Sequence, residues 1–394
     1  MNQIIRYNGY DLLIDHIEKA ENCYLYDAAG KQYIDLESGV WCTSIGHSHP
    51  AITDLIKKQA SLISHTGFSY GNKSVENAAR VILKLLGFEN GKCVFLCSGS
   101  EAVEYGVRSA QQLSGKPFLL TMADSYFGAY GSASMKNPEE WYSFDWQQCQ
   151  ECPVFENCDP ECEKLRVIPY DRVGGFLFEP GSSSGFVRFP PKSLIKVIAK
   201  NITENGGLIL INEVTTGIGR TGKWFGYQHY DLNPDIVAMG KGIGNGYPVS
   251  VAAFNEKVAS RLAQHPIRYA QSHQNDPLGA MIAMEVINVI QRDSLIERGN
   301  ILGIKLIEKL KKISEQFFVI SQIRGRGMMI AMDIKEDSTE SMAKKIQLTL
   351  FSRGFIIARR PGTNTLRLDP PLNIPEEEIN NFINSLVMIL EELS

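Results

Sequence analysis

Short apolar runs alternate with amphipathic runs through the middle of this 394-residue chain. Five apolar runs have the length of buried strands. They lie at Cys93–Cys97, Phe118–Met122, Gly175–Phe178, Leu208–Ile211 and Ile236–Met239. Amphipathic helical runs alternate with these strand-like runs. This alternation predicts an α/β fold in which helices cover both faces of a mostly parallel central sheet.

The two ends of the chain follow other patterns. Tyr24–Val40 has the character of short strands with a turn at Ala29–Lys31, and Gly46–Pro50 introduces a helical pattern that runs to about Ile63. After the last buried run, helical and strand-like segments mix. They lie at Leu278–Gln291, Leu295–Phe317, Gly327–Ile334, Ser341–Ser352, Phe355–Ala358 and from Pro375 onward.

This final third predicts a smaller α+β domain, because the chain is longer than one hydrophobic core usually organises. We predict three parts. Residues 1–45 form an N-terminal segment that joins the small domain, residues 46–275 form the large domain, and residues 276–394 form the small C-terminal domain.

Charge and hydropathy narrow the classes of function. The formal net charge is -4, so the chain has no broad basic field for nucleic acid or an anionic membrane. The N-terminus is too polar for a signal peptide, and no apolar stretch is long enough to span a bilayer. We therefore expect a cytoplasmic protein that acts on a small molecule.

Four of the eight cysteines gather in one compositionally unusual stretch. Their spacing, Cys149-x2-Cys152-x5-Cys158-x3-Cys162, fits a tetrahedral thiolate site for a structural zinc or an iron–sulfur cluster. The alternative is a reduced, acidic surface loop, because five carboxylates accompany the thiols. Both interpretations stay open from the sequence.

A lysine follows the last buried strand. Lys241 stands in a glycine-rich turn after Ile236–Met239, where the backbone can approach a ligand closely. Pyridoxal-phosphate chemistry needs a lysine amine for a Schiff base, donors for the phosphate, and a group that faces the pyridine nitrogen. Taken alone, a solvated surface lysine is an equally good interpretation.

A second candidate element follows the first buried strand. Ser98, Gly99 and Ser100 precede a helix that we expect to open at Ala102, and a helix N-terminus of small residues suits a phosphate. An ordinary helix cap is the alternative. Gly217–Lys223 has the spacing of a nucleotide-binding loop, but Trp224 replaces the required Ser or Thr, which excludes that function.

The order of motifs resembles class III aminotransferases, the group that contains ornithine and acetylornithine aminotransferases, over nearly the whole length. The matching stretches are Tyr33–Gly39, Gly46–Pro50, Ser98–Glu104, Ser125–Gly128, Glu179–Pro180, Asn212–Gly222, Pro234–Pro248 and Leu366–Leu372. The resemblance implies pyridoxal phosphate as cofactor and fold type I, the aspartate-aminotransferase-like fold. It also implies a homodimer with active sites at the interface.

The resemblance also implies roles for individual residues. Lys241 is expected to form the Schiff base, and Arg367 to bind a substrate carboxylate with Trp41 as an aromatic wall. Tyr126 is expected to stack on the cofactor ring, and Ser272 to reach the phosphate of the partner subunit. The remaining expected cofactor contacts are Ser98, Gly99, Ser100, Glu179, Asn212, Val214 and Thr215.

Three positions depart from the family pattern. Asn212 replaces the aspartate that faces the pyridine nitrogen, Thr215 replaces a glutamine near the phenolic oxygen, and Phe127 replaces a histidine. A neutral Asn212 cannot stabilise a protonated ring nitrogen by ion pairing, so it makes the ring a weaker electron sink.

We therefore predict an aminotransferase that moves an amino group from an amino acid or ω-amino compound to a 2-oxo acid such as 2-oxoglutarate. Asn212 favours an alternative on the same fold, a pyridoxal-phosphate racemase, epimerase or lyase. A cofactor-binding scaffold or regulatory protein is a third interpretation, and it predicts a bound cofactor that never converts.

Overall fold

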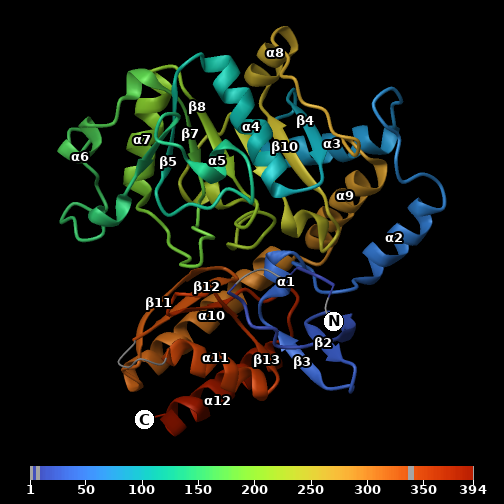
Figure 1. Cartoon of the computed structure of the whole chain (residues 1–394), viewed down its shortest axis with the longest axis vertical. Helices are drawn as coiled ribbons and strands as arrows, with labels where there is room; N and C mark the ends of the chain where they lie inside the picture. Colours follow the sequence, from blue (N-terminus) through green and yellow to red (C-terminus); the bar gives the residue numbers. More distant parts are fainter. Residues whose placement is uncertain (1–2, 6–8, 336–340, 394) are drawn as a thin grey trace.

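The computed structural model describes residues 3–5, 9–335 and 341–393. The predicted parts 1–45 and 276–394 therefore include positions outside the described residues. Figure 1 shows a larger upper body and a smaller lower body, with both termini in the lower body.

The upper body is built on a seven-stranded sheet with the order β4-β10-β9-β8-β7-β5-β6. Its strands are β4 Lys92–Leu96, β5 Phe118–Met122, β6 Trp141–Phe144, β7 Val173–Phe178, β8 Leu208–Asn212, β9 Ile236–Met239 and β10 Ser250–Phe254. Neighbours from β9 to β6 pair in parallel, and only β10 runs antiparallel to its two neighbours. The predicted α/β class with a mostly parallel sheet is confirmed.

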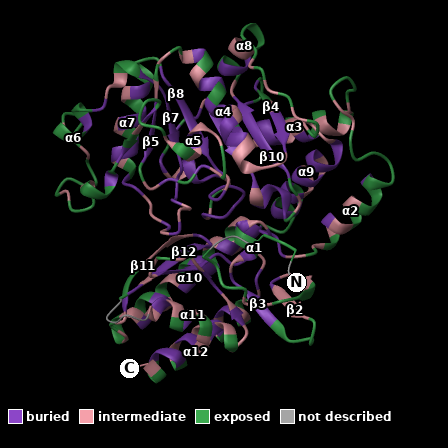
Figure 2. Cartoon of the chain, in the orientation of Figure 1, coloured by how far each residue is buried: buried purple, intermediate pink, exposed green. Residues whose placement is uncertain are grey.

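Both faces of this sheet are buried. In β9, Ile236 and Ala238 join one hydrophobic cluster and Val237 and Met239 join another, as the two-residue period of a strand requires. Figure 2 shows the buried strands between helices that are exposed on their outer sides. The helices of the upper body are α3 Lys73–Leu86, α4 Gly99–Ser114, α5 Ser132–Met135, α6 Glu163–Arg166, α7 Lys192–Glu204, α8 Glu256–Gln264 and α9 Pro277–Arg292.

The lower body contains two four-stranded sheets, ordered β1-β2-β3-β13 and β11-β12-β15-β14. Their strands are β1 Ile17–Glu21, β2 Tyr24–Asp27, β3 Gln32–Asp35, β11 Ile320–Arg326, β12 Met329–Ile334, β13 Phe355–Ile356, β14 Ala358–Arg359 and β15 Thr365–Leu368. The accompanying helices are α10 Leu295–Gln316, α11 Met342–Ser352 and α12 Glu376–Leu393, and α2 Pro50–Ala60 leads to the upper body. Four 3-10 turns complete the elements, at Trp146–Cys149, Tyr170–Arg172, Gly226–His229 and Lys241–Gly244.

The division into three parts stays a prediction, and the sheets support it. Every strand of the seven-stranded sheet lies between Lys92 and Phe254, and the strands of the smaller sheets lie outside that range. The parallel pairing of β3 with β13 attaches the N-terminal segment to the C-terminal part. Within the described ranges, no helix combines the length and apolar character that crossing a bilayer demands.

The prediction of strand up to Val40 was wrong. β3 ends at Asp35, and α1, Ser38–Trp41, is a turn in which all four residues have positive φ, between 50° and 64°. Asp35 stabilises this left-handed turn because its carboxylate accepts the N–H groups of Glu37 and Gly39. A contact that is distant in sequence also holds the turn, since the Ser38 hydroxyl donates to the Asp369 carbonyl at 2.6 Å, and such contacts override the local strand pattern.

Candidate active site

A cavity of about 180 Å³ opens at the carboxyl edge of the large sheet. Parallel strands end there, which is where ligands bind in open α/β sheets. Seven of the residues predicted from the sequence line it, namely Gly99, Ser100, Tyr126, Asn212, Val214, Thr215 and Lys241. The structure thus brings together side chains from four separate stretches of the chain.

Lys241 follows β9 through Gly240 and has a φ of 46°, a conformation that non-glycine residues seldom adopt. Its Nζ lies 5.1 Å from the centre of the Trp41 ring. Burial lowers the pKa of the Lys241 amine, and the nearby Cys42 and Glu179 oppose that shift. A buried amine with a lowered pKa holds more of the neutral, nucleophilic form near neutral pH.

The N-terminus of α4 forms one wall of the cavity. The helix begins at Gly99, three residues earlier than predicted, because Ser98 is its N-cap and forms a capping box with Glu101. Ser98 therefore caps the helix, whereas Gly99 and Ser100 line the cavity. The fit at Gly99 is close, since a Cβ there would lie 2.7 Å from a methyl group of Val214.

Tyr126 is positioned through its backbone. Its N–H donates to Glu179 Oε2 at 3.0 Å, and its carbonyl accepts from Asn212 Nδ2 at 3.1 Å. Glu179 also accepts from the Ser183 hydroxyl and is itself buried behind Tyr126. Burial raises the pKa of Glu179 to about 7, and the hydrogen bonds from Ser183 and Tyr126 act against this. Glu179 supports the cavity wall and is not part of the cavity lining.

The end of β8 supplies three more residues. Asn212 Oδ1 accepts the Val214 N–H at 3.1 Å, so both ends of its amide are held by backbone groups. These two partners define which atom is nitrogen and which is oxygen. Thr215 Oγ1 is buried and has no hydrogen-bond partner among the described residues. A buried hydroxyl without a partner at a cavity wall is a natural contact for a polar ligand.

Arg367 lies on β15, with its guanidinium carbon 3.9 Å from the centre of the Trp41 ring. Its side chain is 7% exposed, and its Nε has no hydrogen-bond partner among the described residues. Two carboxylates stand close, Asp369 at 3.9 Å from Nε and Glu37 at 4.0 Å from Nη2. Neither Arg367 nor Trp41 lines the 180 Å³ cavity, but Trp41 contacts both Lys241 and Arg367.

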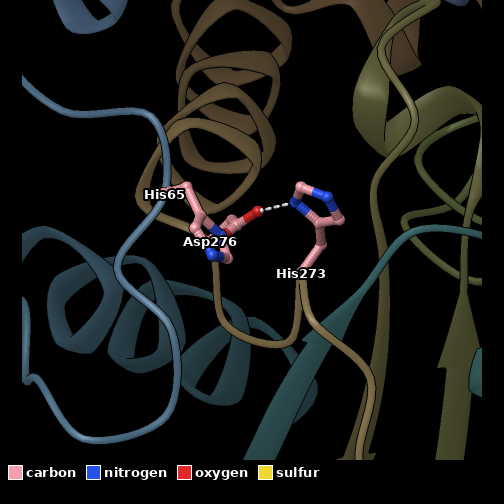
Figure 3. A group of neighbouring side chains, drawn as sticks. All are labelled: His65, His273 and Asp276. Atoms are coloured by element: carbon pink, nitrogen blue, oxygen red, sulfur yellow. Dashed lines mark hydrogen bonds and ion pairs between the residues drawn. The ribbon is translucent and has the colours of Figure 1, made fainter.

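Ser272 lies away from the cavity of its own chain. It is exposed, in the loop that precedes α9. Two histidines flank Asp276 in this region, and His65 Nδ1 and His273 Nδ1 each lie 2.6 Å from one of its carboxylate oxygens. Figure 3 shows the two rings on either side of Asp276. The Asp276 carboxylate forms a hydrogen bond with each of the two rings, so this group anchors the loop.

The four clustered cysteines lie outside the cavity, in the segment between β6 and α6. In Figure 1 this segment stands at the outer edge of the upper body, opposite α2 and well away from α1. All eight cysteines of the chain are free thiols in the structure.

Sequence reasoning missed several residues that shape the site. Ser183 also lines the cavity, and its hydroxyl donates to the Glu179 carboxylate. Ala129, another lining residue, donates its N–H to Ser100 Oγ at 3.0 Å. The run of three serines after Glu179-Pro180 was a visible signal for Ser183. Glu37 and Asp369 had no local signal, because only the fold brings them to Arg367.

Comparison with known proteins gives one family and several similar chains. The family described as "Aminotransferase class-III" matches residues 7–390. A leucine/methionine racemase of Thermococcus litoralis is 28% identical, with 93% of this chain and 88% of the relative covered. An acetylornithine aminotransferase of Caldanaerobacter subterraneus subsp. tengcongensis is 29% identical, with coverages of 98% and 96%. The crystal structure of a Bacillus anthracis aminotransferase superposes with a TM-score of 0.85 at 26% identity, covering 96% of this chain and 93% of that one.

Proposed function

The chain belongs to the class-III aminotransferase family of fold-type-I, pyridoxal-phosphate-dependent enzymes, and we propose that its donor is an amino acid whose carboxylate binds Arg367. The acceptor is a 2-oxo acid. The observation that carries this proposal is the buried Lys241 amine at a cavity whose walls suit each part of the cofactor.

The residues of the cavity fit pyridoxal phosphate. The N–H groups at Gly99 and Ser100 open a 16-residue helix and suit the phosphate. Tyr126 and Val214 supply flat and apolar surface for the ring, and the unpartnered hydroxyl of Thr215 suits its phenolic oxygen. When bound, the cofactor supplies an electron sink that allows a proton to leave the substrate carbon beside the amine.

Lys241 has two tasks in this proposal. Its amine would hold the cofactor covalently between reactions, in the neutral form that burial favours. With the substrate in place, Lys241 Nζ would take the proton from the substrate carbon that bears the amine and would hold it for return later in the reaction.

Arg367 would bind the substrate carboxylate with its guanidinium fork. The buried Nε is without a hydrogen bond, and the flat face of the guanidinium already rests on Trp41. Because Lys241 also contacts Trp41, a substrate at this ring could meet the amine and the guanidinium together.

Asn212 favours a second candidate function, amino-acid racemisation. With Oδ1 engaged by Val214, the amide presents its second N–H as the remaining polar group. An N–H donor suits an unprotonated pyridine nitrogen, and an unprotonated ring would withdraw electrons less strongly. Return of the proton to the same substrate carbon, which gives racemisation, would then be favoured over transfer of the amino group. The similarity to a leucine/methionine racemase supports this candidate.

We further propose a homodimer in the cytoplasm. Large apolar side chains are exposed between α2 and α3, with Leu62 at 72%, Phe68 at 67% and Tyr70 at 75%. Such a group of exposed side chains is typical of an interface. Ser272 lies away from its own cavity, which supports a role in a partner's site. Eight free thiols suit a reducing compartment.

Product analysis tests the proposal. The holoenzyme is incubated with single L- and D-amino acids, with and without 2-oxoglutarate, and keto acids and enantiomers are quantified. We expect keto acid that depends on the acceptor, no turnover by K241A, and normal turnover by K223A, which removes a solvent-facing lysine. If the amino acid is converted to its enantiomer and no keto acid forms, the protein is a racemase. If the cofactor stays bound and no amino acid is converted, the protein has a scaffold role.

A further inference from the structure

The segment from Gln147 to Lys164 has an interior made of cysteine alone. Every residue in it is exposed except Cys149, Cys152, Cys158 and Cys162, which are partly buried. Even its larger apolar side chains, Val154 and Phe155, point outward, at 49% and 39% exposure. A segment with so little apolar interior lacks the burial that normally stabilises a fold.

Two tight turns bring the cysteines into pairs. The Cys152 N–H donates to the Cys149 carbonyl at 3.2 Å, and the Cys162 N–H donates to the Asp159 carbonyl at 3.1 Å. The Cys158 thiol points to that same Asp159 carbonyl at 4.0 Å. Each turn therefore presents two thiols, and the turns lie at the two ends of the segment.

A contact across the segment holds its two ends together. Lys164 Nζ donates to the Gln148 carbonyl at 2.8 Å, next to Cys149. Cys149, Cys158 and Cys162 pack against the same hydrophobic cluster. Thiols from both turns therefore point inward on one side of the segment.

We propose that Cys149, Cys152, Cys158 and Cys162 bind one Zn²⁺ ion as a structural site. Four thiolates around one ion give the closed tetrahedral geometry of structural zinc. The four thiols release four protons to solvent and form a complex of net charge -2, which the nearby Lys164 partly offsets. No redox step and no second reactant is involved.

Binding would tighten the segment. Among the described residues, the only group with three ligand atoms within 4.8 Å of one another is His65, His273 and Asp276, so no three of the four sulfur atoms lie that close together. Tetrahedral zinc with bonds of about 2.3 Å requires sulfur atoms roughly 3.8 Å apart. The residues that link the two turns are exposed, so the turns can move together without displacing a packed core.

The first test is metal analysis of the purified holoenzyme. We expect one zinc per chain, and loss of most of it in C158S and in C162S. The matched control is C93S, which removes a partly buried cysteine of β4 and should keep its zinc. Three results would each overturn the proposal. They are iron together with acid-labile sulfide, disulfides between these cysteines in protein kept in reductant, and absence of zinc after reconstitution with a zinc salt.

A second test uses the wild-type chain, so that it does not depend on the folding of variants. Zinc is removed with a chelator in reductant and replaced by Co²⁺, and we expect the intense visible bands of tetrahedral cobalt thiolate. Trypsin should cut at Lys164 or Arg166 at least tenfold more slowly with zinc than without. Weak octahedral cobalt bands and equal cleavage would contradict the site. Neither readout depends on amino-group transfer, so either proposal can fail alone.

Discussion

At the scale of single residues, Asn212 has the largest consequence for the chemistry. Its amide donates to the Tyr126 carbonyl and accepts from the Val214 N–H, so it cannot turn its oxygen toward a ligand without breaking both bonds. An aspartate at this position would lose the first bond and add a negative charge at the cavity wall. The identity of this one side chain therefore decides how strongly a bound ring withdraws electrons.

We expect N212D to raise the ratio of keto-acid formation to inversion at the substrate carbon by about tenfold. The added carboxylate stabilises a protonated ring nitrogen, and a shift of one pKa unit corresponds to about 1.4 kcal/mol. Mass spectrometry of keto acids and chiral chromatography of the same samples measure the ratio. N212A is the control, because it removes the amide without adding charge. An unchanged ratio in N212D would show that Asn212 does not control the outcome.

Glu37 gives a second prediction, on pH dependence. Burial raises the pKa of Glu37 to about 7, with Arg367 opposing the shift and Asp35 and Asp369 adding to it. Below pH 7 Glu37 is neutral and leaves Arg367 to the substrate. Above pH 7 Glu37 is ionised and competes with the substrate carboxylate, so KM should rise up to about tenfold between pH 6 and 8.

Steady-state kinetics of the wild type and of E37Q check this dependence. The neutral amide in E37Q should make KM nearly independent of pH over that range, and an amine donor without a carboxylate should show no rise in either protein. A KM that falls with pH, or an equal slope in E37Q, would contradict the competition between Glu37 and the substrate.

At the scale of elements, the contact between α4 and the end of β8 shapes the cavity. Gly99 begins the helix, and Val214 follows the strand, with room for a hydrogen but not for a methyl group between them. In G99A the new Cβ pushes against Val214, and such overpacking costs about 1–3 kcal/mol.

We expect G99A to weaken pyridoxal-phosphate binding about 5- to 100-fold, measured by absorbance titration of the apoenzyme. V214A should lose part of the affinity because it trims the apolar surface offered to the ring, and the double variant G99A/V214A should bind as well as V214A because the clash is gone. The clash with Val214 would be disproved as the cause of weaker cofactor binding by either of two results. G99A could bind as tightly as the wild type, or the double variant could bind no better than G99A.

The left-handed turn α1 is a strained element beside the site. Val40 has φ 61° and ψ 53°, an unfavourable conformation for a β-branched residue, and its side chain is 47% exposed. Asn adopts this conformation more easily, so V40N should raise the free energy of unfolding by about 1 kcal/mol. Urea unfolding of the holoenzyme measures it. V167N, at an exposed valine with φ of -77°, should change stability by less than about 0.5 kcal/mol.

At the scale of the whole molecule, the fold brings segments from the two ends of the chain together beside the cavity of the upper body. Arg220 is fully buried at the junction, where it donates to the carbonyls of Met328 and Pro370. Its burial lowers its pKa to about 10, with Asp369 and Asp35 opposing. The buried Arg220 cation therefore ties the upper body to the lower one, whereas the pairing of β3 with β13 joins the two ends of the chain within the lower body.

The exposed apolar segment between α2 and α3 predicts the assembly. We expect the double variant F68D/Y70D to reduce the mass measured by light scattering to that of one chain, and to weaken cofactor retention. The control is F318D, which changes a 79% exposed phenylalanine beside β11 and should leave the mass unchanged. A dimer that persists in F68D/Y70D would place the interface elsewhere, and a wild type that is monomeric would exclude the homodimer.

The sequence by itself determined the class of fold and the positions of its local elements. The strands Phe118–Met122 and Ile236–Met239 have the predicted bounds, because burial on both faces leaves a continuous apolar run that can be recognised locally. The motif order was also sufficient to place the chain in its family, since the family model spans residues 7–390.

Only the tertiary structure decided the rest. The strand order, with β10 between β4 and β9, depends on which distant runs pair, and no local pattern encodes it. The meeting of Trp41, Lys241 and Arg367, the pKa of Glu37 and the left-handed turn at Val40 all arise from contacts between segments far apart in sequence. The sequence carries the pattern that each segment needs, and long-range burial selects how the segments meet.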